Sequence, residues 1–209
     1  MAYHNPYPHL FSPMYVGKHK IKFNNRIFMA PMSTEHDPVS HVILDDNIEF
    51  YAKRARGGCG CVEIGETRQD VVNCAAHPAQ LDLTDPKTLI QLNKFNNYAH
   101  TYGARTSVEL NHAGHFALPE CNDGVTPPMS ACEMDMPSGT HVRAMNDDDM
   151  NYVADIYAKA VHMAWRGGFD MVTLHYGHGW LFGGWLSPMV NKRTDEHGGC
   201  RENLSLIHI

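Results

Sequence analysis

The chain has 209 residues, of which 43% are hydrophobic and 19% charged, and these proportions are ordinary for a globular domain with one sizeable core. A net charge of -6 and a pI of about 6.2 argue against a surface that binds nucleic acid or anionic membranes. No apolar run approaches the roughly 20 residues of a membrane helix, and the first residues do not resemble a signal peptide, so we expect a cytoplasmic protein.

Three segments show the apolar spacing and the boundary residues of helices. In each, apolar residues recur every three or four positions, and a capping side chain or a glycine stands at one or both ends. We therefore expect helices at 45–56 before Gly57, at about 86–102 between Asp85 and Gly103, and at about 147–166 after Asn146.

Four short apolar runs lie before, between and after these helices and are typical of buried parallel strands. They are RIFMA at 26–30, CVEIG at 61–65, TSVEL at 106–110 and DMVTLH at 170–175. Strands and helices alternate, which fits either a (β/α)8 barrel or an open doubly wound sheet. Neither GxGxxG after a strand nor GxxxxGK(S/T) occurs, so the nucleotide-binding open sheets are less favoured.

Polar residues cluster where each expected strand ends. They are Pro31-Met32-Ser33 after the first strand, Gly65-Glu66 after the second, Glu109 and His112 at the third, and His175 and His178 at the fourth. In a barrel the carboxyl ends of all strands surround one mouth, which is where active sites lie. This clustering favours a barrel, although polar groups at strand ends can also simply mark the edge of a core.

The six cysteines do not have the spacing of a metal site. They are Cys59, Cys61, Cys74, Cys121, Cys132 and Cys200, and no two of them form a CxxC pair. Their scatter in a chain of this length also argues against a disulfide framework. We expect Cys59 and Cys61, on either side of Gly60, to be small residues of a strand.

Only four strands are visible, whereas a full barrel takes eight strands and typically about 250 residues. The last six residues, LSLIHI, break the character of the preceding loop and match the translation of a transposon-end adapter used in sequencing libraries. We therefore expect 204–209 to be a non-native tail. The alternative is a genuine apolar strand or the start of a helix.

Several long motifs resemble one family. GFDMV, HxxHGWL, LSP, NKRTDEHGG and REN within 167–203, together with LFSPMYVG, NRIFMAPMS and VELNHAGH earlier in the chain, are similar to the old yellow enzyme family of flavin oxidoreductases. The resemblance is strongest to the branch with 2-enoate reductases, 2,4-dienoyl-CoA reductases and bile-acid-type NADH:flavin oxidoreductases. It spans roughly 9–203, nearly the whole chain.

The resemblance implies a (β/α)8 TIM barrel, truncated after about four βα units, with 1–203 as its N-terminal part and FMN at its mouth. It implies an ene-reductase, in which reduced flavin passes hydride to the alkene of an α,β-unsaturated carbonyl compound and NAD(P)H is the reductant. The catalytic residues would be His175 and His178, whose rings would donate hydrogen bonds to the carbonyl oxygen as it gains negative charge.

The resemblance also implies the residues that contact flavin and substrate. Flavin contacts carry over to Ala30, Pro31, Met32, Ser33, Gly65 and Glu109. Glu109 stands where many relatives have a glutamine at the pyrimidine edge, and a carboxylate there would accept from a ring N–H but repel an anionic reduced flavin. Besides the histidine pair, Trp180 and His112 are the expected substrate contacts.

Two departures from the family pattern matter. Trp180 stands where many relatives carry a tyrosine that protonates the substrate, and an indole N–H is not a usable acid. The phosphate-binding loops, and any iron–sulfur cluster or FAD domain, would lie beyond 203. We therefore expect this chain alone to bind little flavin, to be inactive and, because its sheet has open edges, to be poorly soluble.

Two other readings stay open. A metal-dependent TIM-barrel hydrolase could use His175 and His178 with Glu109 and His112, although the first strand lacks the HxH of many such barrels. The chain could also be a non-functional fragment of a longer enzyme. For the flavoenzyme we expect an enone, enoate or enoyl-CoA substrate as partner, with no nucleic acid and no membrane, and an oligomer is possible for the full-length protein.

Overall fold

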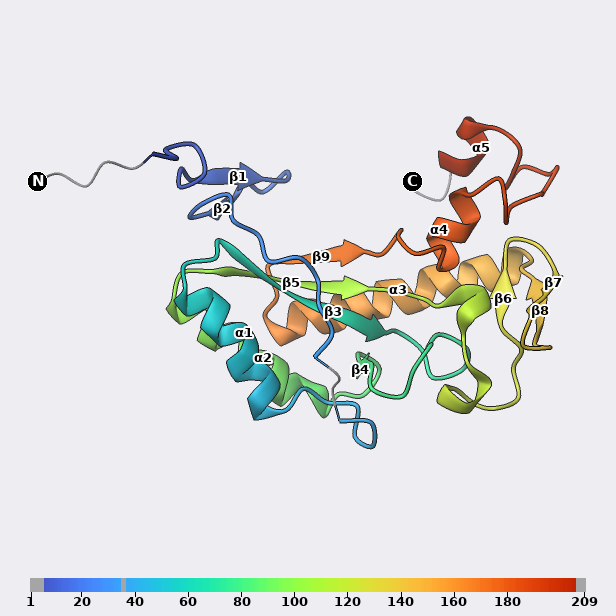
Figure 1. Cartoon of the computed structure of the whole chain (residues 1–209), viewed down its shortest axis with the longest axis horizontal. Coiled ribbons are helices and arrows are strands. Elements are labelled where there is room, and N and C mark those ends of the chain that lie inside the picture. Colours follow the sequence, from blue (N-terminus) through green and yellow to red (C-terminus); the bar gives the residue numbers. More distant parts are fainter. Residues whose placement is uncertain (1–5, 35–36, 206–209) are drawn as a thin grey trace, which may run out of the picture.

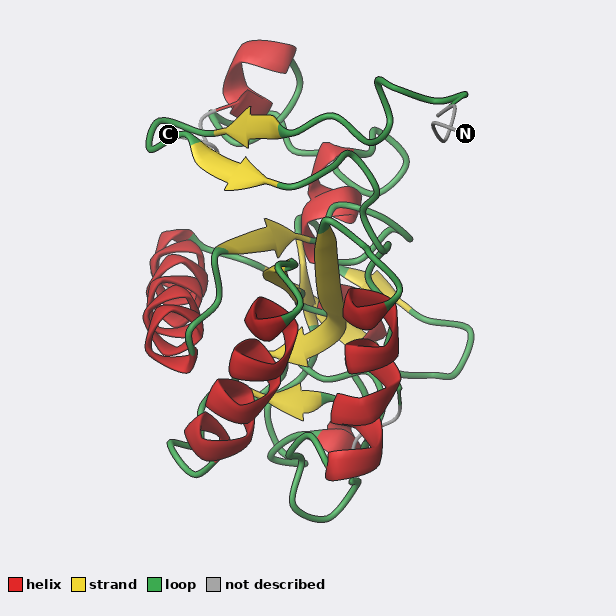
Figure 2. Ribbon diagram, turned by 90° about the vertical axis from the view of Figure 1, so that its left-hand side faces the viewer, coloured by secondary structure: helices red, strands yellow, loops and turns green. Residues whose placement is uncertain are grey.

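The computed structural model of the protein describes residues 6–34 and 37–205. Its centre is a parallel sheet with the strand order β4-β3-β5-β9 (Figure 1). These strands are β3 (Cys61–Arg68), β4 (Leu81–Asp82), β5 (Arg105–Leu110) and β9 (Met171–Leu174). The three long helices α1 (Asp45–Arg56), α2 (Thr88–Thr101) and α3 (Asp147–Gly167) pack side by side on one side of the strands (Figure 2).

The first expected strand is present as an extended segment beside β3. Phe28 pairs with Cys61 and Met32 with Ile64, both in parallel, and the Met29 N–H donates to the Cys61 carbonyl oxygen at 3.0 Å. This segment, β3, β5 and β9 are therefore parallel neighbours in the order of the chain, and the two-residue β4 pairs with the last part of β3. Sequential parallel neighbours joined by helices are the pattern of a (β/α)8 barrel, and the expected fold class is confirmed for its N-terminal part.

Smaller elements cover the two ends of the strands (Figure 1). A hairpin of β1 (Met14–Val16) and β2 (Ile21–Phe23) lies at the amino ends, where Arg105 Nε donates to the Lys22 carbonyl oxygen at 2.9 Å. Most of the others follow β5 or β9 on the carboxyl side. They are η1 (Gly114–Phe116), η2 (Pro119–Cys121), β6 (Met129–Ser130), β7 (Met134–Asp135), β8 (His141–Ala144), α4 (Leu181–Leu186) and α5 (Arg201–Ser205).

The two faces of the sheet have opposite chemistry because successive side chains on a strand alternate between faces. Val62 and Val108 point to the helices and join a core with Phe95. On the inner face the Ser107 hydroxyl donates to Glu63 Oε1 at 3.1 Å and lies 3.2 Å from Thr173 Oγ1. The barrel interior is thus polar in the layer below the strand ends, and burial raises the pKa of Glu63.

Helix boundaries follow the capping signals closely. The first helix spans the expected residues, and α3 begins after Asn146, whose side-chain oxygen accepts from the Asp149 N–H at 2.9 Å. The second begins at Thr88, two residues later than expected, because Asp85 Oδ1 binds the Lys87 N–H at 2.9 Å and closes a turn ahead of the helix.

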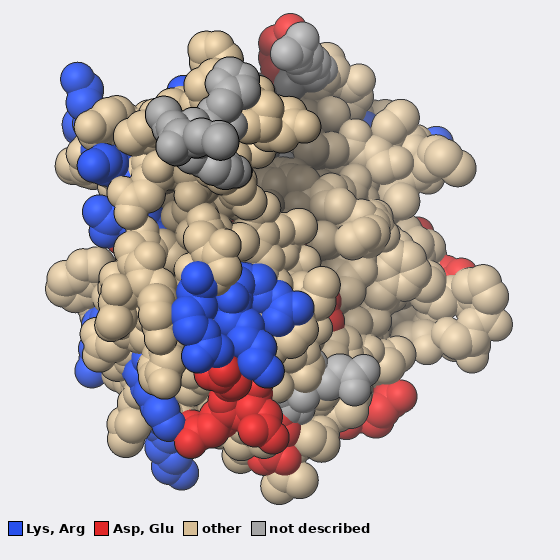
Figure 3. All heavy atoms as spheres, turned by 60° about the vertical axis from the view of Figure 1, so that its left-hand side comes forward, with Lys and Arg blue, Asp and Glu red and all other residues tan. Residues whose placement is uncertain are grey.

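Charge on α1 follows the helix dipole, with Asp45 and Asp46 in the first turn and Lys53, Arg54 and Arg56 in the last. Figure 3 shows basic and acidic side chains next to each other on the face that it presents, without an extended basic stripe. Within the described ranges, no helix has both the length and the apolar character that crossing a bilayer demands. The six thiols are free there as well.

The expected non-native tail begins inside α5. Leu204 is half-buried and packs against the hydrophobic core. Residues 206–209 lie outside the described residues, so the tail stays a hypothesis.

Candidate active site

The carboxyl-terminal parts of neighbouring strands bring most of the expected site residues together. Gly65 and Glu66 lie within β3 and not, as expected, after it, because this strand continues past an irregularity to Arg68. A Cβ atom placed on Gly65 would lie 2.9 Å from both Pro31 Cβ and the Met32 nitrogen, and 3.0 Å from Glu109 Oε2. Contacts this short are not tolerated, so only glycine lets the first strand and Glu109 approach β3 here. Residues separated by 78 positions in the chain thus form one continuous wall.

Glu109 and the two histidines form a hydrogen-bonded row. Glu109 Oε1 lies 2.7 Å from His175 Nδ1, and His175 Nε2 lies 3.1 Å from His178 Nδ1. Glu109 is buried, whereas His178 is exposed. His178 has a φ of 57°, a left-handed conformation that costs energy for a residue other than glycine and is typical of functional sites.

One contributor to the site was not expected from the sequence. The Tyr51 hydroxyl of α1 donates to the Met32 carbonyl oxygen at 2.6 Å and fixes the segment that passes Gly65. Burial raises the pKa of Tyr51 to about 12, so it is a neutral donor at neutral pH. The sequence shows only an apolar stripe with a tyrosine in it; the signal is that a buried phenol needs an acceptor.

The segment expected to run along flavin is open to solvent. Ala30 and Pro31 are exposed, Met32 is 49% exposed, and Ser33 is half-buried next to them. A row of small and apolar groups lies beside a carboxylate here, as a flat heteroaromatic ring requires.

His112 differs from the expectation of a residue at the mouth. It is 2% exposed, and its Nδ1 accepts from the Gly114 N–H at 3.0 Å, which turns the ring into the η1 turn. Burial lowers the pKa of His112 to about 4. Its carbonyl oxygen accepts from the Leu181 N–H at 3.0 Å, so its visible role is to anchor α4 rather than to face a substrate.

Trp180 does lie beside the histidines. Its ring is edge-on to His175, with 5.4 Å between ring centroids and 73° between planes. Glu66, also expected at the mouth, is instead paired with His77 Nε2 and receives a 3.4 Å contact from Asn111 Nδ2. Trp180 therefore forms one side of the site, while Glu66 stabilises the loop after β3.

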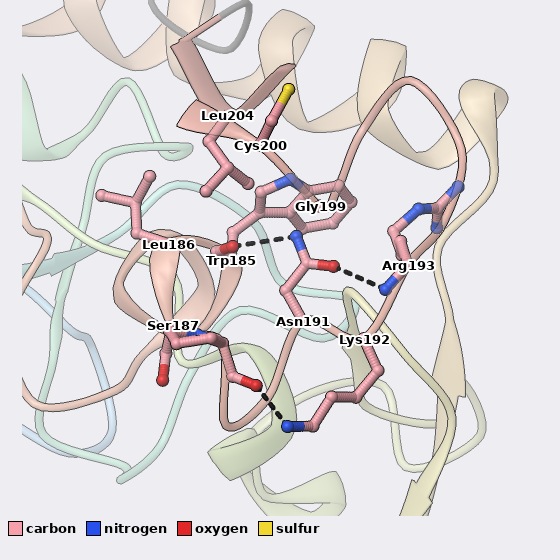
Figure 4. Close-up of a pocket in the computed structure, with 10 residues that line it drawn as sticks. Trp185, Leu186, Ser187, Asn191, Lys192, Arg193, Gly199, Cys200 and Leu204 are labelled. Atoms are coloured by element: carbon pink, nitrogen blue, oxygen red, sulfur yellow. Dashed lines mark hydrogen bonds between the residues drawn. The ribbon is translucent and has the colours of Figure 1, made fainter. Parts of the chain in front are cut away.

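A hollow of about 650 Å³ lies elsewhere, between α4 and α5. Figure 4 shows the Asn191 side chain at its centre, donating to the Trp185 carbonyl oxygen at 2.9 Å and accepting from the Arg193 N–H at 3.0 Å. Arg193 also donates to the Met145 carbonyl oxygen at 2.8 Å. These contacts hold the loop after β9 in place, and none of the strand-end residues lines this hollow.

The described residues contain no group of three or more His, Cys, Asp or Glu side chains arranged to hold a metal ion. The hydrolase reading therefore has no ligand set in this part of the chain. The site is instead a carboxylate–imidazole row beside a flat, open wall at the mouth of a parallel barrel, an arrangement suited to a planar cofactor and an anionic oxygen.

Comparison with known proteins identifies the family. Residues 9–205 match the NADH:flavin oxidoreductase / NADH oxidase family, and the chain belongs to it. It is 30% identical to an NADH oxidase of Thermoanaerobacter brockii over 94% of this chain and 30% of that protein, and 31% identical to an NADPH dehydrogenase of Bacillus licheniformis over 88% and 53%. The chain thus spans about a third to a half of the length of these relatives.

Solved structures agree on the fold. An old yellow enzyme from Pichia superimposes with a TM-score of 0.85 at 24% identity, over 96% of this chain and 54% of that one. A 2-naphthoyl-CoA reductase superimposes with a TM-score of 0.84 at 22% identity, over 97% of this chain and 32% of that one. At this identity the likeness establishes the barrel architecture, and the chemistry has to come from the site.

Proposed function

We propose that this chain forms the N-terminal part of an FMN-dependent oxidoreductase of the ene-reductase type. Its substrates would be α,β-unsaturated carbonyl compounds, such as enones, enoates or enoyl-CoA thioesters, and NAD(P)H would be the reductant. The observation that carries the proposal is the meeting of Gly65 in the second half of β3, Glu109 near the end of β5 and His175 just after β9.

The residues present fit the ring of the cofactor. When bound, FMN would supply the hydride for the alkene. Pro31, Met32 and Gly65 would line the ring, and Ser33 would lie near its polar edge. The Oε1 atom of Glu109 is occupied by His175, while Oε2 faces Gly65 and would accept from a ring N–H.

The phosphate of FMN has no such fit here. Phosphate sites use backbone N–H groups at glycine-rich turns or basic side chains, whereas these strand ends present carboxylates and imidazoles. That part of the site, and the nicotinamide site, would be supplied by segments corresponding to the rest of the relatives. Nothing in the described residues supports an iron–sulfur cluster or FAD.

The substrate side is formed by His178 and Trp180. His178 Nε2 makes no hydrogen bond with the described residues and would donate to the carbonyl oxygen, which gains negative charge as hydride arrives. Trp180 would confine the substrate, and His175 would hold His178. A direct substrate contact by the buried His112 would require the η1 turn to open.

Flavin titration of the chain tests the ring site. We expect weak quenching of flavin fluorescence on binding, with FMN and riboflavin bound alike. Gly65→Ala should weaken both by at least about tenfold, because the new methyl group meets three neighbours within 3.0 Å. Gly57→Ala is the matched control, because a Cβ atom there would lie 3.3 Å from its nearest neighbour, the Lys53 carbonyl oxygen. Equal binding by the two variants contradicts the ring site.

Hydride transfer is tested in a single turnover, because steady-state turnover is not expected from these residues alone. Chemically reduced FMN and the chain are mixed without oxygen with 2-cyclohexen-1-one, and flavin oxidation is followed by absorbance. We expect a faster reaction than with free reduced FMN, and loss of the acceleration in His178→Leu. An identical rate with and without the chain would refute the proposed activity.

A further inference from the structure

The row of Glu109, His175 and His178 leads from a buried carboxylate to an exposed imidazole. Glu109 is 9% exposed and lies 2.7 Å from His175 Nδ1, while the outer contact, His175 Nε2 to His178 Nδ1, is 3.1 Å. Both nitrogens of His175 are therefore used, and His178 Nε2 is the one ring nitrogen of the pair without a hydrogen bond to the described residues.

Counting protons along the row shows two states. An ionised carboxylate only accepts, so the proton between Glu109 and His175 resides on Nδ1. The hydrogen bond between His175 Nε2 and His178 Nδ1 contains one proton. If this proton belongs to His178 Nδ1, both imidazoles are neutral, and His178 Nε2 has no proton and can only accept a hydrogen bond. If the row holds one more proton, His175 donates from both nitrogens and His178 Nε2–H becomes an outward donor.

We propose that Glu109 is a positioning residue that couples the hydrogen-bond donor at His178 Nε2 to the uptake of one proton by the row. This inference rests on the proposed function, because an enolate oxygen needs that donor. Only the proton-loaded state offers it, and the buried carboxylate stabilises this state by balancing the charge of the His175 imidazolium.

The same row can deliver the proton that the reaction consumes. As hydride bonds to the β-carbon, the alkene electron pair moves to the carbonyl oxygen. His178 Nε2 gives its proton to that oxygen, and His178 Nδ1 takes the proton from His175 Nε2. His175 is left neutral with Nδ1–H still on Glu109, the product leaves as an enol that tautomerises, and solvent reloads the row through exposed His178. The Trp180 indole is not needed as an acid.

The loop holds the two rings in this arrangement. His178 has its left-handed φ of 57° between two glycines, and a Cβ on Gly177 would lie 3.2 Å from the His175 ring. Gly177 thus allows the chain to fold back so that one ring faces the other. A strained backbone conformation persists only where the surrounding structure holds it, so the loop keeps the two rings in a fixed relative position.

Other titratable groups lie near the row. Glu63 of β3 lies on the inner face of the sheet with Glu109, Tyr157 of α3 packs behind it, and Tyr176 lies in the loop itself. Burial raises the pKa of all three. His115 lies beyond them under α4, and burial lowers its pKa. Among the described residues, Glu109 is the carboxylate that lies within hydrogen-bond distance of either histidine ring.

Magic-angle-spinning NMR of the full chain with ¹⁵N-labelled histidine tests the coupling without any flavin. The signals are assigned by their loss in His175→Asn and His178→Asn. We expect His175 Nδ1 to carry a proton at every pH at which the chain is folded, and both rings to change together with a single midpoint. Glu109→Gln keeps an acceptor but removes the charge, and should lower that midpoint by about one pH unit or more.

Glu63→Gln is the matched control, since it removes a carboxyl group from the same inner face and should leave the midpoint in place. If Glu109→Gln fails to fold, His178→Asn carries the test: His175 should then titrate at a shifted midpoint. Independent titration of the two rings in the unmodified chain, or equal shifts in Glu109→Gln and Glu63→Gln, would overturn the inference. Because no flavin is present, failure of the proposed function leaves this result intact, and the reverse also holds.

Discussion

Single side chains in this site act through the partner that the fold brings to them. From its type alone, Glu109 could bind a flavin ring, a metal ion or neither. Its role is defined by His175 Nδ1, which lies 2.7 Å from its carboxylate. Tyr51 is similar: its ring packs in the core with Phe95, while its hydroxyl reaches the Met32 carbonyl oxygen and sets the position of the wall. The geometry of the site therefore depends on buried groups behind it.

Tyr51→Phe tests this dependence. Loss of one hydrogen bond should lower the free energy of unfolding by about 1 kcal/mol, measured by urea denaturation. Flavin binding should weaken as well, because the Met32 segment loses its anchor. Tyr15→Phe, in which the ring is 64% exposed, is the control and should change neither quantity. A Tyr51→Phe variant with unchanged stability and binding would show that Met32 is held by the sheet alone.

Elements are joined at the amino ends of the strands by one carboxylate. Asp170, just before β9, accepts from Arg105 Nη1 at 2.7 Å, from His100 Nε2 at 2.8 Å and from the Thr106 N–H at 2.9 Å. Burial alone would raise the pKa of Asp170, but the hydrogen bonds and the positive charge of Arg105 outweigh it and lower the pKa. β5, α2 and β9 thus share one ionic clamp.

The sign of the pH dependence follows from this shift. A carboxyl group with a lowered pKa in the folded state stabilises the fold above its unfolded pKa of about 3.9, and this stability is lost as the pH falls through the folded value. Asp170→Asn should cost about 2–3 kcal/mol at pH 7, and the difference from the unmodified chain should shrink below pH 4. Urea denaturation across pH measures it, with exposed Asp155→Asn as the control. A cost that stays constant down to pH 2 would exclude an ionic clamp.

At the scale of the molecule, β9 forms an open edge of the parallel sheet within the described residues. In the ranges that the structure describes, β9 pairs with β5 alone, and a groove of about 460 Å³ lies between α3 and the loop after β9. Its apolar lining includes Val153, Val161, Leu174 and Phe182, of which Val161 and Leu174 are more than 40% exposed. An open strand edge next to an apolar groove favours association.

We therefore expect the chain to self-associate through this side. Val161→Lys should raise the dissociation constant of the associated form by at least about tenfold in sedimentation velocity, since a lysine in the contact must be desolvated. Ile90→Lys, at an apolar position on α2 that is 77% exposed, is the control with the same charge change. If both variants associate like the unmodified chain, the contact lies elsewhere.

The sequence by itself determined the elements, because their signals are local. Apolar spacing located α1 and α3, Asn146 and the glycines marked ends, and short β-branched runs marked the strands. Long motifs also indicated the family, and with it Gly65, Glu109, His175 and His178 as site residues. Each of these inferences needs only neighbours in the chain.

Only the tertiary structure decided which residues are hydrogen-bond partners in the site. Glu109 meets His175 across 66 positions and Tyr51 meets the Met32 carbonyl across 19, while His112 turns inward to the Gly114 N–H and Glu66 pairs with His77. A side chain near the end of a strand can face a site or pack beneath it, and a rotation about one or two bonds separates these outcomes. The choice is made by the hydrogen-bond partners that packing brings within 3 Å, and those partners are distant in sequence.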